Sequence, residues 1–214
     1  MRSEKKEKAA DKLIKAGTSL FAEKGYHETS VRDIAKTAGV NPSLINYHFG
    51  GKEELYRTIL EEAGITSATR FHRILGEVAS KEEFQFRFKM MIEELVKGSI
   101  HNFDIQRIIE QVIHNQNDIG EEVFKERHFS ILQKIIDFIN DAQNKGFIRS
   151  DIEPKLVGLM IVAFVRNLSL MRHAINNFMG LNIAEDSVQN QTIDTLLKLV
   201  LAGLDKDPGR RSTD

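Results

Sequence analysis

Short polar side chains gather between residues 41 and 52, and their chemistry suits contact with nucleic acid. Asn41, Ser43 and Asn46 carry amides and a hydroxyl short enough to reach base edges, and an asparagine amide pairs well with adenine. Leu44 lies among them and offers an apolar group for the methyl of thymine. These residue types at this spacing could read the edges of double-stranded DNA.

Donors for phosphate oxygens stand on both sides of this group. Thr29 and Ser30 place hydroxyls and backbone N–H groups at the expected start of a helix, where an anion is favoured. For Tyr47, packing against its neighbours is an equal alternative, and Arg32 either touches the DNA backbone or is simply solvated. The candidate DNA contacts are Thr29, Ser30, Arg32, Asn41, Pro42, Ser43, Leu44, Asn46, Tyr47, His48 and Lys52.

Two short helices must position these side chains. Ser30-x-x-Asp33 predicts a capping box at the start of the first, and Gly39 breaks the chain after it. Asn41 is expected to cap the second, with Pro42 in its first turn, where a missing N–H costs nothing. Two helices of about seven residues joined by a glycine-bearing turn are typical of a helix-turn-helix.

The rest of the chain also shows helical spacing, with apolar residues at steps of three and four. A first helix is expected from about Ser3 to Lys24, ended by Gly25. Further helices are expected from Lys52 to Val78, from Ser80, from Asp104, from Asp118 to Gly146, from Pro154 to about Phe178, and on to about Leu204. The predicted fold is all-α, with a three-helix helix-turn-helix head at residues 1–51, a larger helical-bundle body at residues 52–214, and about nine helices in total.

Composition narrows the class of protein. Residues 1–52 carry 10 Lys and Arg against 6 Asp and Glu, whereas residues 53–214 carry 20 against 25, so a basic head precedes an acidic body. There is no cysteine, and the seven histidines form no i,i+4 pair, so we expect no metal and no cofactor. No apolar run reaches the length of a membrane span, and we expect a cytoplasmic protein with no membrane partner.

The head resembles a known family. Gly25-Tyr26, Thr29-Ser30-Val31-x-x-Ile34-Ala35, Ala38-Gly39-Val40 and His48-Phe49-x-x-Lys52-x-x-Leu55 resemble the DNA-binding head of TetR-family transcriptional regulators. The resemblance covers about residues 8–60, and the stretch Lys145–Pro154 resembles the linker before that family's last two helices. The family often has Ser, Gly and Tyr where this chain has Asn41, Ser43 and Asn46, so the residues that read bases differ.

The resemblance implies a body that forms a homodimer and binds a small-molecule effector of unknown identity. The helix expected from Pro154 is apolar nearly all round, which favours cover by a second copy. The dimer candidates are Leu156, Met160, Phe164, Ile193, Leu197, Val200, Leu201 and Leu204. The effector candidates, which plain core packing would also explain, are Phe124, His128, Met160, Arg166, Asn167 and His173.

The sequence therefore predicts a ligand-responsive regulator, a repressor in the family's usual manner, that binds a palindromic operator in double-stranded DNA as a dimer. A small effector would release it, and an apolar lining would favour a lipophilic one. We expect no enzyme, because the chain has no glycine-rich phosphate loop and no G-x-S-x-G or H-E-x-x-H motif. The alternative is a helical protein that binds small molecules or other proteins without an operator.

Overall fold

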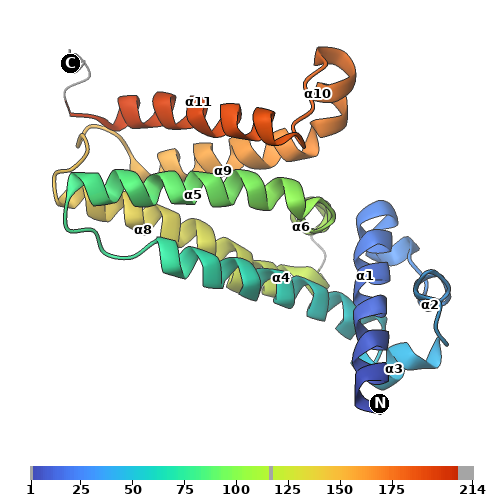
Figure 1. Ribbon diagram of the computed structural model, residues 1–214. Coiled ribbons are helices and arrows are strands. Elements are labelled where there is room, and N and C mark those ends of the chain that lie inside the picture. Colours follow the sequence, from blue (N-terminus) through green and yellow to red (C-terminus); the bar gives the residue numbers. More distant parts are fainter. Residues whose placement is uncertain (1, 116–117, 207–214) are drawn as a thin grey trace. The chain divides into compact units, whose positions relative to one another are not determined.

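The computed structural model describes residues 2–115 and 118–206, and within these residues every regular element is a helix (Figure 1). The chain divides into two compact units. The first combines residues 1–67 with residues 103–129, and the second combines residues 68–102 with residues 130–214. The predicted all-α class is confirmed. Counting the unbroken run Asp118–Asn144 as one helix, the described residues form ten helices, close to the nine expected.

The first unit contains the expected head and more. It holds α1 (Arg2–Glu28), α2 (Val31–Ala38), α3 (Ser43–Phe49), the first part of α4 (Lys52–Ile74), α6 (Phe103–Asn115), α7 (Asp118–Val123) and the π-helix η1 (Phe124–Phe129). Its core joins buried residues of the head to α4 and α6, among them Leu13, Phe21, Ile34, Ile45, Leu55, Tyr56 and Ile108. The head is therefore packed on helices that the sequence assigned to the body.

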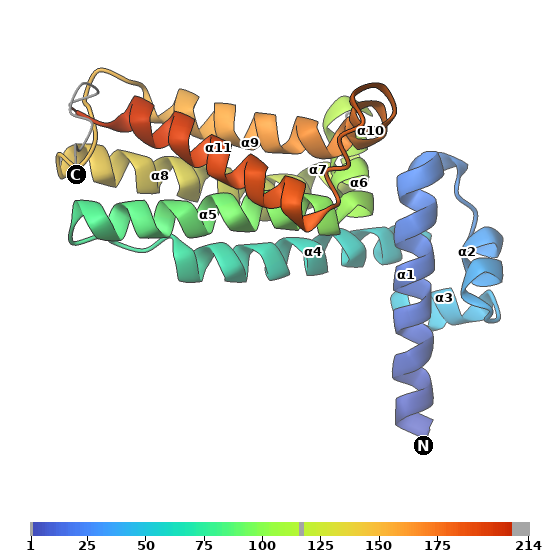
Figure 2. The same cartoon turned by 45° about the horizontal axis from the view of Figure 1, so that its top comes forward.

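The second unit is a helical bundle with a core of its own. It holds the end of α4, α5 (Lys81–His101), α8 (Ser130–Asn144), α9 (Pro154–Leu170), α10 (Arg172–Met179) and α11 (Asp186–Leu204). Figures 1 and 2 show α5, α8, α9 and α11 running alongside one another. Their facing sides bury Phe84, Phe88, Met91, Ile135, Ile139, Ile161 and Val165.

Two expected helices differ in detail from the structure. The helix predicted from Pro154 to Phe178 is wrong as a single element, because Met171 adopts φ −83° and ψ 4° and ends α9, and α10 follows at a bend of 66°. The helix predicted from Asp118 to Gly146 is present to Asn144, but six of its residues form η1. π segments of this kind are rare and often lie at functional sites.

Within the described residues, no single helix is long and apolar enough to cross a membrane. The bent pair α9 and α10 meets the criteria of length and composition when taken together. Across the same residues there is no group of three or more His, Cys, Asp or Glu side chains placed to hold a metal ion.

Candidate nucleic-acid interface

Helix α2 is fixed at both ends by its own sequence. Ser30 Oγ accepts a hydrogen bond from the Asp33 backbone N–H at 3.1 Å, and the Asp33 carboxylate accepts from Ser30 N at 3.3 Å, so the predicted capping box is confirmed. The Ser30 hydroxyl also donates to Asp33 Oδ2 at 2.6 Å, and this bond lowers the pKa of the Asp33 carboxyl. Gly39 ends the helix at φ 66°, a conformation that side chains other than glycine rarely adopt.

Helix α3 presents the predicted polar side chains to solvent. Asn41 Oδ1 accepts from Ser43 N at 2.9 Å and from Ser43 Oγ at 2.8 Å, so Asn41 caps this helix as expected. Pro42 is exposed and already helical in its backbone, and Asn46 is exposed. Ile45 is fully buried and holds the opposite side of the helix in the core. An anchored helix with short polar groups on its outer face is the arrangement that a reader of the major groove needs.

Tyr47 and His48 lie at the far end of α3. The Tyr47 side chain is 60% exposed, and its ring meets that of His48 edge to face, with centroids 5.1 Å apart. Leu44 and His48 are half-buried, and Arg32 on α2 is exposed. The outer surface of the head therefore carries apolar, amide, hydroxyl and cationic groups within two short helices.

Lys52, at the start of α4, has a role within the head that the sequence did not reveal. Its Nζ donates to the carbonyl oxygens of Tyr26 at 2.9 Å and of Thr29 at 3.0 Å, and it lies 4.1 Å from the centre of the Tyr26 ring. Partial burial lowers the pKa of this lysine. Lys52 thus ties the α1–α2 turn to α4, and one of its three N–H donors is left over after these two bonds.

The expected phosphate contact of Thr29 is corrected by the structure. Thr29 is 1% exposed, and its hydroxyl lies 2.7 Å from the Gly25 carbonyl and 3.2 Å from the Leu20 carbonyl, to which it donates. Its backbone N–H donates to Tyr26 O at 3.4 Å. Both donors of Thr29 are therefore used inside the head, and its role is to hold the turn that precedes α2.

Tyr26 and Tyr56 pack inside the head, a role that the sequence did not predict. Tyr26 stacks near Phe21 at 5.9 Å and meets Tyr56 at 5.1 Å, and Phe21 meets Tyr56 edge to face at 5.0 Å. Burial raises the pKa of Tyr56 to about 12. The Gly25-Tyr26 pair was visible as part of a motif, but the lysine partner of Tyr26 lies 26 residues away, beyond any local signal.

The six effector candidates do not share one place in the structure. Phe124 and His128 belong to the first unit, where their rings stack at 6.1 Å and His128 Nε2 lies 3.3 Å from the Leu60 carbonyl. Burial lowers the pKa of His128, which favours the neutral form of its imidazole. The other four belong to the second unit, where Met160, Asn167 and His173 are exposed and Arg166 is half-buried.

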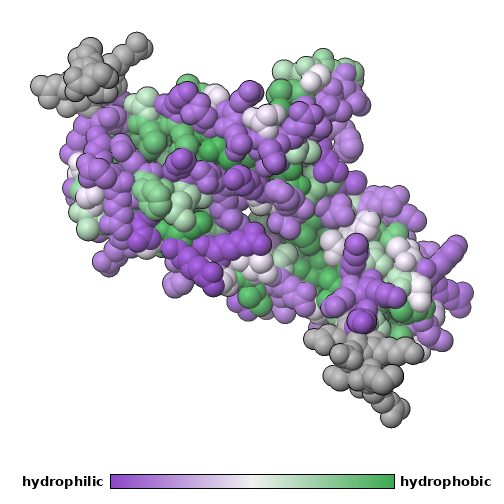
Figure 3. Space-filling model, in the orientation of Figure 1, coloured by the Kyte–Doolittle hydropathy of each residue, from purple (hydrophilic) through white to green (hydrophobic). Residues whose placement is uncertain are grey.

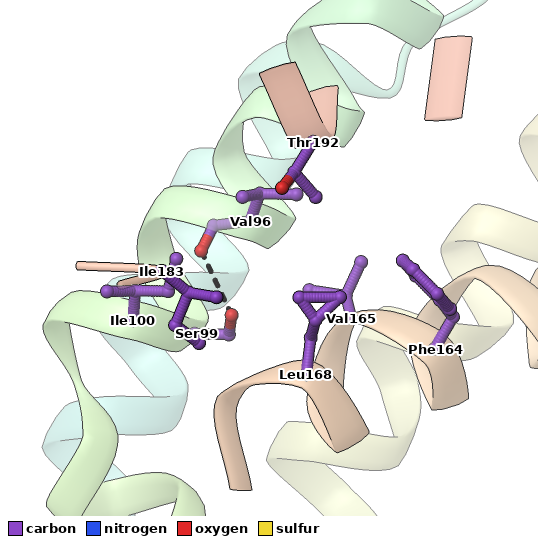
Figure 4. A pocket seen from close by; sticks show the side chains of 8 residues that line it. All are labelled: Val96, Ser99, Ile100, Phe164, Val165, Leu168, Ile183 and Thr192. Atoms are coloured by element: carbon purple, nitrogen blue, oxygen red, sulfur yellow. Dashed lines mark hydrogen bonds between the residues drawn. The ribbon is translucent and has the colours of Figure 1, made fainter. Parts of the chain in front are cut away.

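A cavity in the second unit involves none of these six residues. It lies between α5, α9 and α11, and Figure 4 shows the side chains around it. Its walls are Val96, Ser99, Ile100, Phe164, Val165, Leu168, Ile183 and Thr192. This cavity is a candidate site for a small apolar ligand.

The dimer candidates divide into outward-facing and inward-facing side chains. Leu156, Met160 and Phe164 form an exposed stripe on α9, with Met160 71% exposed. Ile193 and Leu204 are 5% and 3% exposed within their own bundle, so their expected contact with a second copy is corrected to core packing. Leu197, Val200 and Leu201 are half-buried against the same core.

Two exposed residues that the sequence did not single out complete this face. Leu159 on α9 is 46% exposed and Leu199 on α11 is 70% exposed. Figure 3 shows apolar atoms at the surface over α11 and over α10, where Phe178 and Met179 are exposed. A cluster of exposed apolar side chains such as this is typical of an interaction site.

The capped helices α2 and α3 define a helix-turn-helix DNA-binding domain. Comparison with known proteins agrees: residues 13–59 match the family model described as bacterial regulatory proteins, tetR family. The chain is 21% identical to the HTH-type transcriptional repressor NicS of Pseudomonas putida over 215 residues, which cover 95% of this chain and 96% of NicS. Residues 13–59 therefore carry the DNA-binding domain of the TetR family, and the resemblance of the head to TetR-family transcriptional regulators is confirmed.

Solved structures show the same fold along nearly the whole chain. The ketosteroid transcriptional regulator KstR2 of Mycobacterium tuberculosis superposes with a TM-score of 0.72 at 20% identity, covering 92% of this chain and 95% of KstR2. The regulator FadR of Bacillus subtilis, solved in complex with stearoyl-CoA, superposes with a TM-score of 0.66 at 18% identity, covering 87% and 96%. The two-unit helical architecture is thus one that regulators of this kind adopt.

Proposed function

We propose that this protein is a transcriptional repressor that binds a palindromic operator as a homodimer and is released by a small lipophilic effector. One observation carries the DNA-binding part of the proposal. Helix α3 is capped by Asn41, ended by Gly50 and anchored by Ile45, and it turns the exposed side chains of Ser43 and Asn46 outward.

In this proposal α3 enters the major groove and α2 lies across the DNA backbone. The amides of Asn41 and Asn46 contact base edges, with Ser43 as a short hydroxyl partner and Leu44 against a thymine methyl. The Asn41 Oδ1 already accepts two bonds from Ser43, so its Nδ2 is the atom left to donate. Asn46 is therefore the principal candidate for base recognition.

Contacts with phosphate hold the head in register. Arg32, Tyr47 and His48 supply donors on the outer face, and the remaining N–H of Lys52 supplies a charged one. Ser30 and the exposed start of α2 offer a backbone site for an anion, and Pro42 allows close approach at the start of α3. Because these contacts are electrostatic, binding should weaken steeply with salt.

The proposed homodimer forms through the exposed faces of α9 and α11. Leu156, Leu159, Met160 and Phe164 repeat at steps of three and four on α9, and Leu199 adds to them from α11. A two-fold contact of this kind buries the same stripe of both copies. It would also set the two heads against half-sites separated by about one helical turn of DNA, roughly 34 Å, or a multiple of it.

The proposed effector acts by preferring one conformation of the body. It can shift DNA binding only by as much as its affinities for the two conformations differ. An apolar cavity in the second unit and the acyl ligand of the FadR structure support a lipophilic effector. In functional terms, residues 1–51 would read DNA and residues 52–214 would dimerise and bind the effector, although the compact units divide the chain differently.

Selection of bound fragments from random duplex DNA at moderate salt tests this proposal. The wild type should enrich a two-fold symmetric site. Asn46→Ala should lose or change the preference at a symmetric pair of positions, whereas Asn140→Ala, an exposed asparagine on α8, should enrich the wild-type site. If the wild type enriches no site at low or moderate salt, then the proposal is wrong.

A further inference from the structure

Ile183 is a buried residue in an otherwise exposed connection. It lies between α10 and α11, where its neighbours Leu181, Asn182 and Ala184 are all exposed, Leu181 to 39%. Ile183 itself is 2% exposed, and Figure 4 shows its side chain beside Ser99 and Ile100 in the cavity of the second unit. A single loop side chain therefore fills space that three helices leave between them.

The walls around Ile183 are suited to aliphatic groups and to little else. Five of the other seven lining residues contribute hydrocarbon side chains, and none of the lining residues is charged. The two hydroxyls are already engaged, because Ser99 Oγ donates to Val96 O at 2.9 Å and Thr192 Oγ1 donates to Val188 O at 2.8 Å. A polar ligand would lose its hydration here with few new bonds in return.

The loop holds Ile183 in place from its C-terminal side. Asn182 forms a turn, with its Oδ1 accepting from Ala184 N at 3.2 Å and its carbonyl accepting from Glu185 N at 3.0 Å. The buried amide of Gln189 donates to the Ala184 carbonyl at 3.0 Å. These bonds anchor the segment beyond Ile183 to α11.

The N-terminal side of the loop begins at Gly180, next to exposed side chains. This glycine ends α10 at φ 65°, and a Cβ added there would have no atom within 4 Å. The short helix that precedes it carries Phe178 and Met179, which are 87% and 73% exposed and so make little contact with the described structure. The loop therefore joins a firmly bonded end to an end that packs loosely.

We propose that Ile183 is an exchangeable plug and that the cavity it fills is a binding site for an alkyl or acyl chain. The terminal carbons of the ligand would take the place of the Ile183 side chain between α5, α9 and α11. The occupant that the structure already shows there is a branched four-carbon alkyl group, so a chain end of the same chemistry fits the same walls. The assignment of such a chain as the effector rests on the proposed function, whereas its binding does not.

Phe164 gives the site a route to the rest of the molecule. It lines the cavity, and it is also 47% exposed on the stripe of α9 proposed to contact a second copy. A chain that displaces Ile183 and fills the cavity would press on this ring from inside. A ligand bound in the cavity would therefore affect the proposed dimer face.

Calorimetric titration with neutral n-alkanols, from 1-butanol to 1-octanol, tests the plug on the full chain. Because each buried methylene contributes a factor of about four, affinity should rise with chain length until the cavity is full. Ile183→Ala should bind 1-hexanol at least about tenfold more tightly than the wild type, because the plug no longer competes. Leu181→Ala, which shortens an exposed side chain in the same loop, should bind as the wild type does.

The plug is excluded if Ile183→Ala and Leu181→Ala bind 1-hexanol equally, or if no alkanol binds Ile183→Ala. If Ile183→Ala fails to fold, then Ile183→Val, which removes one methylene, replaces it in this test. Its affinity for 1-hexanol should exceed that of the wild type a few-fold. Operator binding is measured separately on the same proteins. If every variant selects the operator and none binds alkanol, then the proposed plug is wrong and the proposed function is supported. If alkanols bind and no operator is selected, then the plug is supported and the proposed function is wrong.

Discussion

Replacement of Lys52 by methionine should loosen the head without removing any of its core. Methionine keeps an unbranched apolar stem over the Tyr26 ring but cannot donate to the carbonyls of Tyr26 and Thr29. Those two oxygens would lose a charged donor, and the α1–α2 turn would lose its tie to the start of α4. The sequence alone would suggest that Lys52 matters only for phosphate binding.

The expected loss follows from three contacts. A hydrogen bond to a charged donor contributes about 1.5 to 3 kcal/mol, but these two bonds are only partly buried, so we take about 1 kcal/mol for each. The contact with the Tyr26 ring at 4.1 Å adds about 0.5 to 1 kcal/mol. Lys52→Met should therefore reduce the free energy of unfolding of the first unit by about 2 to 3 kcal/mol.

Tyrosine fluorescence isolates this unit. The chain has no tryptophan and three tyrosines, and Tyr26, Tyr47 and Tyr56 all belong to the first unit. Urea unfolding followed by tyrosine emission should show a lower midpoint for Lys52→Met. Lys36→Met removes the same charge from an exposed position on α2 and should stay within about 0.5 kcal/mol of the wild type.

Equal midpoints for Lys52→Met and Lys36→Met would refute the structural role of Lys52. A weaker operator affinity without any loss of stability would mean that this lysine serves DNA alone. We expect both effects, with the dependence of affinity on salt reduced by about one phosphate contact per head.

Three further changes probe other parts of the molecule. Asn46→Ala should weaken binding to the selected operator by about 1 to 3 kcal/mol while leaving the salt dependence unchanged, as titrations at several salt concentrations would show; an equal loss of affinity for the operator and for random duplex would assign Asn46 to phosphate. Met160→Glu should raise the dissociation constant of the dimer at least about 100-fold in sedimentation equilibrium, because two copies lose an apolar contact, whereas Met90→Glu on α5 should not; equal effects would place the interface elsewhere. The pKa of Tyr56 is about 12 in the folded state against 10.0 for the free side chain, so the free energy of unfolding should fall as pH rises from about 10 to 12, by no more than roughly 3 kcal/mol. Tyr56→Phe should show a smaller fall, and the same fall in Tyr56→Phe and the wild type would contradict this prediction.

The helix-turn-helix could be predicted because its signals are local. The Ser30–Asp33 capping box spans three residues, and Gly39 and Gly50 each end a helix through their own backbone conformation. Asn41 caps α3 two residues ahead of its partner Ser43. Interactions between residues so close in the chain can be predicted from the spacing of residue types.

Interactions between distant segments could not be predicted in this way. Lys52 bonds to carbonyls 23 and 26 residues away, and a lysine at the start of a helix gives no sign of such partners. The burial of the Thr29 hydroxyl depends on the carbonyl of Leu20 in the preceding helix. The residue types alone therefore predicted DNA contacts for both. In the structure, Thr29 uses both of its donors inside the head, and Lys52 uses two of its three.

Periodicity also cannot separate the inward and outward sides of a helix that is rich in apolar residues. On α11, Ile193 and Leu204 turn inward, whereas Leu199 turns outward, although all three fit steps of three and four. Ile183 is a still harder case, since a single buried residue in an exposed loop carries no periodic signal. Such positions become visible only when the packed bundle shows which space remains to be filled.

The affinity of the wild type for its selected operator, compared with the same duplex in which one half-site is scrambled, tests the central claim most directly. At moderate salt we expect two chains per intact duplex and a loss of at least about 100-fold when one half-site is scrambled, since the second head then makes only nonspecific contacts. Equal affinity for the two duplexes, or one chain bound to the intact site, would contradict sequence reading by a pair of α3 helices.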